Sequence, residues 1–186
     1  MDEIEQLEQF KTAKDLENVI KELIGEHRDA KKNKIGVMFR IVIPPNSPTT
    51  YEEGHQGKDG DANRYQLVQG VRVCDYKFEK STDLEYVLPD RTCGLSFSRT
   101  FSHLKGTQKM LARHAKGYKK LGPANVSWWI LSKCDMPKGL EFVPDLKDNS
   151  HYFLAATERM HIDILLGKLK RISFHMNVMI DNMTRA

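Results

Sequence analysis

The chain has 186 residues, of which 40% are hydrophobic and 29% charged, and its formal net charge is +4 at pH 7. These proportions are close to those of globular proteins and exclude wholesale disorder. No run approaches the ~20 consecutive apolar residues that a membrane span needs, and the acidic N-terminus is unlike a secretory signal. We therefore expect a cytoplasmic protein without a membrane span, although one delivered into a target cell by a folded-protein export machine would have the same features.

The cysteines and the short motifs exclude several kinds of site. Cys74, Cys93 and Cys134 are widely spaced and form no cluster with zinc-ligand spacing, so we interpret them as reduced thiols. The chain contains neither GxxxxGK[ST] nor GxGxxG nor HExxH. We therefore expect no metal site, and no nucleotide held by a glycine-rich loop.

Along the chain, apolar residues at helical spacing predict an N-terminal helical extension over residues 1–33. The main domain is expected over 34–186 and begins with a near-continuous apolar run, 35–43, which predicts a central strand stopped by Pro44. Residues 44–64 are rich in Pro, Gly, Asn and Asp and predict a long loop, a kind of segment that is usually functional or disordered.

The rest of the chain predicts further short strands and two helices. The strands are expected at 65–78 (one or two around Gly70), 84–88, 126–131, 140–144 and 151–156. Helical spacing predicts one helix over about 101–115 and a closing helix from about His161, with an apolar face that extends to Met176 and Met179. This order indicates an α+β fold rather than a doubly wound parallel sheet.

Arg40 is the only charge in the apolar strand 35–43. A charge there is costly unless it is paired or lines a site. Its planar guanidinium suits a diphosphate or a carboxylate, and the alternative is a salt bridge at the rim of the sheet. His151 and Tyr152 also allow two interpretations, a site or an exposed histidine followed by a core tyrosine.

The stretch from Arg99 to Lys120 contains seven Lys and Arg residues and no Asp or Glu. A helix there could follow nucleic-acid phosphates, dock on an acidic partner, or simply face solvent. The nearby Trp128 and Trp129 could stack on bases. Neighbouring residues of a strand point to opposite faces, however, so we expect at least one of the two rings in the core.

Several short segments of the chain occur in an order that is typical of one protein family. They are Phe39-Arg40, Gly94-Leu95-Ser96-Phe97-Ser98, Trp128 to Leu131, Met136-Pro137-Lys138-Gly139-Leu140, and Asp145 followed by His151-Tyr152-Phe153-Leu154 and Met160. In order and spacing they resemble the ADP-ribosyltransferase-like toxins typified by a small type VI secretion effector. The resemblance covers roughly residues 35–175 and departs from the family at Leu131-Ser132-Lys133-Cys134, where the family has Ile-Pro.

The resemblance implies a fold and a set of site residues. The fold is an ADP-ribosyltransferase-like split β-core with flanking helices, similar to that of diphtheria toxin, with NAD bound in the cleft as a substrate. Arg40 would bind the diphosphate or the ribose, and Ser96 with Ser98 would hydrogen-bond near the nicotinamide ribose. His151 and Tyr152 would line the pocket. Glu158, the nearest acid after that strand, would complete the catalytic set with Arg40 and Ser96.

The function that follows from the resemblance is that of a toxin. We expect an NAD-dependent mono-ADP-ribosyltransferase that cleaves the nicotinamide–ribose bond and modifies an intracellular protein or nucleic acid. An antitoxin, immunity protein or chaperone would be a further partner. Two alternatives stay open at this point: an RNA-binding or RNA-targeting toxin module that uses the basic 99–120 helix, and a catalytically inactive interaction domain of the same fold.

Overall fold

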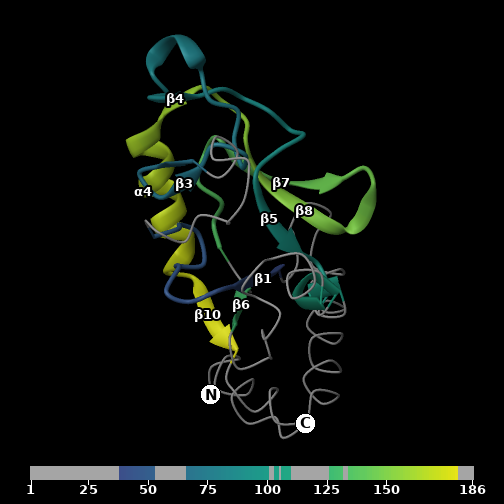
Figure 1. Cartoon of the computed structure of the whole chain (residues 1–186). Coiled ribbons are helices and arrows are strands. Elements are labelled where there is room, and N and C mark those ends of the chain that lie inside the picture. Colours follow the sequence, from purple (N-terminus) through teal and green to yellow (C-terminus); the bar gives the residue numbers. More distant parts are fainter. Residues whose placement is uncertain are drawn as a thin grey trace, which may run out of the picture.

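The computed structural model describes residues 38–52, 66–100, 103–104, 106–109, 126–131 and 134–179. Their main element is a six-stranded sheet in the order β10-β6-β1-β5-β8-β7, in which every neighbouring pair is antiparallel (Figure 1). Its strands are β1 (Met38–Val42), β5 (Leu95–Ser98), β6 (Ser127–Leu131), β7 (Leu140–Asp145), β8 (Asp148–Ala156) and β10 (Met176–Met179).

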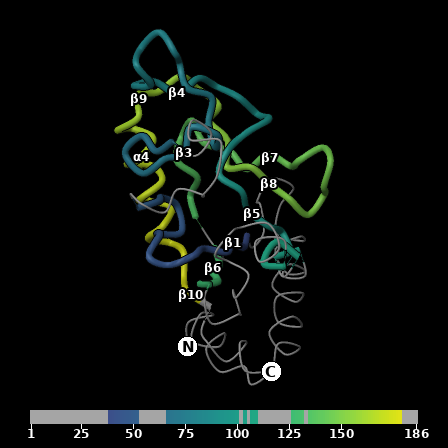
Figure 2. Tube along the Cα trace, in the orientation of Figure 1, coloured from purple at the N-terminus to yellow at the C-terminus, as the bar shows by residue number. Residues whose placement is uncertain are grey.

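Smaller elements complete the described part of the chain. They are β2 (Leu67–Val68) paired with β3 (Val71–Arg72), β4 (Tyr86–Val87) paired with β9 (Met160–His161), the short 3₁₀ helix η1 (Lys80–Thr82) and the helix α4 (Ile162–Ser173). In the view of Figures 1 and 2, α4 and the β7–β8 hairpin lie on opposite sides of β5. The mixture of strands and helix is that of the expected α+β class.

The core forms where α4 packs on the sheet. The helix buries Ile162, Leu165, Leu169 and Ile172, whose spacing places them on one face. These side chains join one cluster with residues of the sheet, among them Leu95, Phe97, Phe142 and Leu154. The helix begins where His161 accepts a hydrogen bond from the Asp163 backbone, and it carries Lys170 and Arg171 in its last turn, which suits its dipole.

Most of the predicted strands are confirmed. The segment around Gly70 forms a hairpin, β2–β3, whose turn residues Gln69 and Gly70 have φ values of 50° and 84°. Positive φ at both central residues is the backbone that a two-residue hairpin turn of type I′ requires. The strands expected at 84–88, 126–131, 140–144 and 151–156 correspond to β4, β6, β7 and β8.

The predicted length of the closing helix is wrong. The helix ends at Ser173, and Met176–Met179 form β10 at the edge of the sheet. There Met176 pairs with Leu131 and Val178 with Trp129, so the backbone groups of β10 bond to β6. A short apolar run fits helical and strand spacing equally well, and pairing with β6 decides between them. The predicted extension 1–33, the domain boundary at 33/34 and most of the predicted helix 101–115 lie outside the described residues.

Truncation of a core side chain of α4 should destabilise the fold. Leu165 is 0% exposed, so Leu165→Ala should lower the free energy of unfolding by about 2–5 kcal/mol. Its neighbour Ile164 is 53% exposed, so Ile164→Ala should change that free energy by about 0.5 kcal/mol or less. Urea unfolding followed by circular dichroism measures both. Equal losses in the two variants would contradict the packing described.

Candidate functional site

The site begins with an interruption in the sheet. β1 pairs with β6 along its whole length, from Met38 to Val42. With its other neighbour, β5, it pairs at one position, Phe39 opposite Ser98. A cavity of about 560 Å³ is lined by residues of both strands beside this position. That volume is within the usual range of small-molecule sites.

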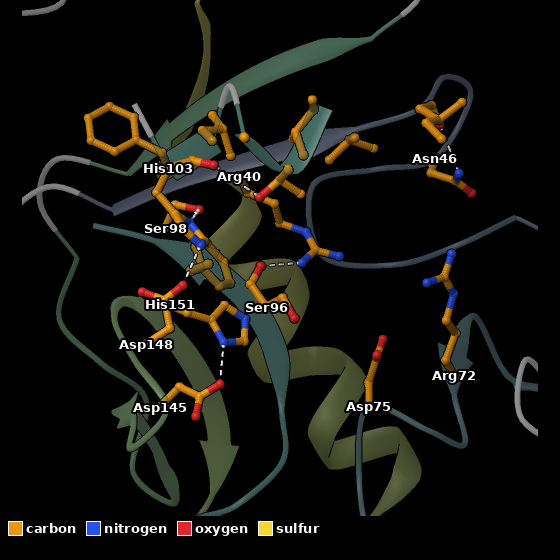
Figure 3. A pocket seen from close by; sticks show the side chains of 18 of the residues that line it. Arg40, Asn46, Arg72, Asp75, Ser96, Ser98, His103, Asp145, Asp148 and His151 are labelled. Carbon is orange, nitrogen blue, oxygen red and sulfur yellow. Dashed lines mark hydrogen bonds and ion pairs between the residues drawn. The ribbon is translucent and has the colours of Figure 1, made fainter. Parts of the chain in front are cut away.

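Four other segments complete the wall of the cavity (Figure 3). They are the loop after β1, the segment from β3 to Asp75, the helical residues 103–104 and 106–107, and the β7–β8 hairpin from Asp145 to His151. In Figure 3, the histidines and the hairpin aspartates lie toward one end of the cavity, and Arg72 and Asp75 toward the other. Ser96 and the guanidinium of Arg40 lie between these two ends.

Arg40 is held in the gap between β1 and β5. Its side chain is 6% exposed. Its guanidinium donates one hydrogen bond to the backbone oxygen of Ser96 and another to the Tyr51 hydroxyl, at 2.7 Å. Among the described residues, its Nε has no hydrogen-bond partner and no carboxylate forms an ion pair with the guanidinium. Within the part of the chain that the structure describes, Arg40 therefore forms no rim salt bridge; it brings a buried charge to the cavity wall, and Asp75 acts on it without forming an ion pair.

A second guanidinium makes this end of the cavity cationic. Arg72 lies over the Tyr51 ring, 3.7 Å from its centroid, and the guanidinium carbon of Arg40 is 5.8 Å from the same centroid. Such stacking orients a guanidinium without using up its donors. Asp75 is the carboxylate at this end, and burial raises its pKa. Of the described residues, a single carboxylate faces two guanidinia here, so it offsets their positive charge only in part.

At the other end, two histidines are each bonded to an aspartate. Nδ1 of His103 lies 2.7 Å from Ser98 Oγ, and its Nε2 lies 3.0 Å from Asp148 Oδ2. Nδ1 of His151 lies 2.9 Å from Asp145 Oδ2. The centroids of the two rings are 6.0 Å apart. Each histidine ring is thus oriented by an aspartate.

Turn chemistry in the hairpin places the two aspartates. Asp145 accepts a hydrogen bond from the Lys147 backbone, and Asp148 accepts one from the Ser150 backbone. Aspartates commonly bond to the backbone two residues on in tight turns. In each case the second carboxylate oxygen is left to bind a histidine. These hydrogen bonds are the main reason that the pKa of both carboxyls is lowered, with a smaller contribution from the histidines.

Four residues predicted from the sequence lie together in the wall of this cavity: Arg40, Ser96, Ser98 and His151. Ser96 is exposed, and Ser98, two residues further along β5, is buried. β1 and β5 lie side by side in the sheet, and β8 lies beside β5, so residues far apart in sequence meet here.

The structure does not place Tyr152 and Glu158 at the cavity. Neighbouring residues of a strand point to opposite faces, so Tyr152 points away from the cavity that His151 lines. Its ring packs against the core cluster, and its hydroxyl accepts a hydrogen bond from Arg99. Glu158 lies beyond the end of β8, where its carboxylate is 3.0 Å from Lys168 Nζ. The carboxylates that line the cavity are instead Asp75, Asp145 and Asp148.

Several lining residues were not singled out as site residues in the sequence: Tyr51, Arg72, Asp75, His103, Asp145 and Asp148. The sequence does hold a signal for one group: Asp145 and Asp148 lie between the predicted strands 140–144 and 151–156, and His151 begins the second strand. The others come from separate segments, and local sequence patterns do not report such long-range proximity.

The tryptophans do not form a stacking platform. Trp128 is 5% exposed, and Trp129 packs against the core cluster. The expectation that at least one belongs in the core is confirmed. Of the basic stretch 99–120, the structure describes residues 99, 100, 103, 104 and 106–109, so most of it lies outside the described part.

Two further findings concern the same described residues. They contain no group of three or more His, Cys, Asp or Glu side chains arranged to hold a metal ion. None of their helical segments combines the length and apolarity that crossing a membrane requires. Comparisons of the chain with protein-family models, with curated proteins and with solved structures find no match.

The hairpin aspartates predict an acid-dependent change. Both carboxyls should titrate with midpoints below 3.8, the value of a free aspartate, when followed by NMR of their side-chain carbons. Because their pKa is lowered by folding, the stability they contribute is present above pH 3.8 and is lost as pH falls below it. Asp145→Asn and Asp148→Asn should each reduce this loss. A midpoint at or above 3.8 would contradict the hydrogen bonding described.

Proposed function

We propose that the chain is a toxin-type, NAD-dependent mono-ADP-ribosyltransferase with an ADP-ribosyltransferase-like split β-core. It would cleave the bond between nicotinamide and ribose and transfer ADP-ribose to an intracellular protein or nucleic acid. The observation that carries this proposal is the buried guanidinium of Arg40, which forms no ion pair with a described carboxylate and lies in the gap between β1 and β5.

The cationic end of the cavity supports binding of a diphosphate. Arg40 and Arg72 converge on Tyr51 from separate strands. An anion with several oxygens can accept hydrogen bonds from two guanidinia at once, which a single carboxylate does less well. The Nε of Arg40, which is buried and unpartnered among the described residues, adds a donor for such a ligand. A dinucleotide meets these requirements because its diphosphate joins two nucleosides.

The opposite end supports the chemistry of the reacting ribose. Departure of nicotinamide leaves positive charge on C1′, and nearby negative charge stabilises it. Asp145 and Asp148 are held ionised at this end by backbone hydrogen bonds. Ser96 and Ser98 bring hydroxyl groups to the same wall. In this proposal the hairpin carboxylates supply the negative charge that the sequence assigned to Glu158, which lies outside the cavity.

The alternative of an RNA-targeting module is less well supported. It relied on stacking by Trp128 and Trp129, whose rings pack within the protein. A catalytically inactive domain of the same fold would bind NAD without releasing nicotinamide. The experiment below separates these alternatives.

Arg40 provides the test of the proposed function. Binding of NAD is measured by isothermal titration calorimetry, and turnover is measured as nicotinamide release. Loss of charge-assisted hydrogen bonds costs about 1.5–3 kcal/mol, so Arg40→Ala should raise the Kd for NAD by about 10- to 100-fold. Arg40→Lys should give a smaller loss, because it keeps the charge and loses the planar fork.

Arg91 provides the matched control. It is an exposed arginine whose guanidinium pairs with Glu141 at 2.7 Å, and it does not line the cavity. Arg91→Ala should leave NAD binding unchanged. Thermal unfolding of every variant shows whether it is folded. Absence of NAD binding by the folded wild-type protein, together with salt-sensitive binding of RNA, would refute the proposal in favour of the RNA-targeting module.

A further inference from the structure

The two histidines at the hairpin end of the cavity differ in how their ring nitrogens are used. Both nitrogens of His103 are occupied, Nδ1 by the Ser98 hydroxyl and Nε2 by Asp148. Only Nδ1 of His151 is occupied, by Asp145 at 2.9 Å. Its Nε2 has no hydrogen-bond partner among the described residues, and the residue lines the cavity. Of the two rings, His151 is therefore the one that can exchange a proton with a bound molecule.

Asp145 fixes the chemical form of the His151 ring. A carboxylate accepts hydrogen bonds, so the neutral ring carries its proton on Nδ1 and donates it to Asp145. The lone pair is then on Nε2. The carboxylate also stabilises the imidazolium that forms when Nε2 takes a proton. The rings of His151 and Phe153 pack in a T-shaped arrangement, with centroids 4.7 Å apart, which further restricts the orientation of His151.

The other cavity groups are less suited to accept a proton. Asp145 and Asp148 each bond to a histidine and to a backbone amide, and their pKa is lowered, which makes them weak bases. Asp75 lies toward the opposite end of the cavity, near Arg72 (Figure 3). Among the residues that the structure describes, the charged and titratable groups that face His151 are thus Asp145, Asp148 and His103.

We infer that His151 is the general base of the reaction and that Asp145 is its positioning residue; this inference rests on the proposed function. In the step, the bond between C1′ of the ribose and nicotinamide breaks, and nicotinamide leaves with the electron pair. The oxygen of an acceptor hydroxyl or of water forms the new bond to C1′. Nε2 of His151 takes the proton from that oxygen and later releases it to solvent.

The test uses NAD and water as reactants, with nicotinamide release measured between pH 5 and 9. A general base contributes about 100-fold or more to the rate, so His151→Gln should lower kcat by about that factor. The KM for NAD should change by about threefold or less, because the base acts after binding. In His151→Gln, the increase of kcat with pH that depends on deprotonation of the base should disappear. Asp145→Asn should give a smaller loss of kcat.

Chemical rescue and a matched histidine exclude a merely structural role. In His151→Ala, added imidazole should restore part of the lost kcat, since it can occupy the vacated space and accept the proton. His161 is also paired with an aspartate, Asp163, at 3.3 Å, but it does not line the cavity. His161→Gln should therefore leave kcat and its pH profile unchanged.

The outcomes separate this inference from the proposed function. If wild-type protein neither binds NAD nor releases nicotinamide, with or without cell lysate as a source of acceptors, the proposed function fails and the inference fails with it. If His151→Gln turns over NAD with the wild-type rate and pH profile, or if imidazole does not rescue His151→Ala, His151 is not the base, while the proposed function stands.

Discussion

The organisation of this protein depends on the point where β1 and β5 meet. The two strands are neighbours in one sheet, yet they pair only between Phe39 and Ser98. Continued pairing would have filled the space with backbone hydrogen bonds. Instead, the guanidinium of Arg40 bonds to the Ser96 carbonyl and the Tyr51 hydroxyl. A carbonyl that a sheet would normally satisfy with an amide is thus satisfied by a side chain, which allows a cavity to enter the sheet.

The rest of the structure holds these two strands in place. β6 pairs with β1 along its length, and β8 pairs with β5 from Leu95 to Ser98. The backbone at Gly94, just before β5, also lies so close to the backbone of Leu154 in β8 that a Cβ at Gly94 would collide with it. α4 covers the sheet with a continuous apolar face. The gap is therefore bounded on both sides by strands that are hydrogen-bonded to further strands, as a preorganised site requires.

The two ends of the cavity have different electrostatic character. Arg40 and Arg72 make one end cationic, and Asp75 is the carboxylate that lines this end. The hairpin contributes two carboxylates and two histidines to the other end. This separation favours a ligand that is anionic in one part and develops positive charge in another. It is the physical basis for proposing NAD, and for assigning proton transfer to the hairpin end.

The sequence by itself determined the α+β class and most of the strands, because alternation and turn residues are local signals. A charge within an apolar run is also a local signal, and it singled out Arg40, whose role in a reaction stays a prediction. Only the tertiary structure decided that Met176–Met179 form an edge strand, since pairing with β6 supplies the partners of their backbone groups. It likewise decided that Glu158 pairs with Lys168 outside the cavity while Asp145 and Asp148 line it. Which carboxylate reaches a site depends on how strands from distant segments are ordered in the sheet, and no local pattern in the sequence encodes that order.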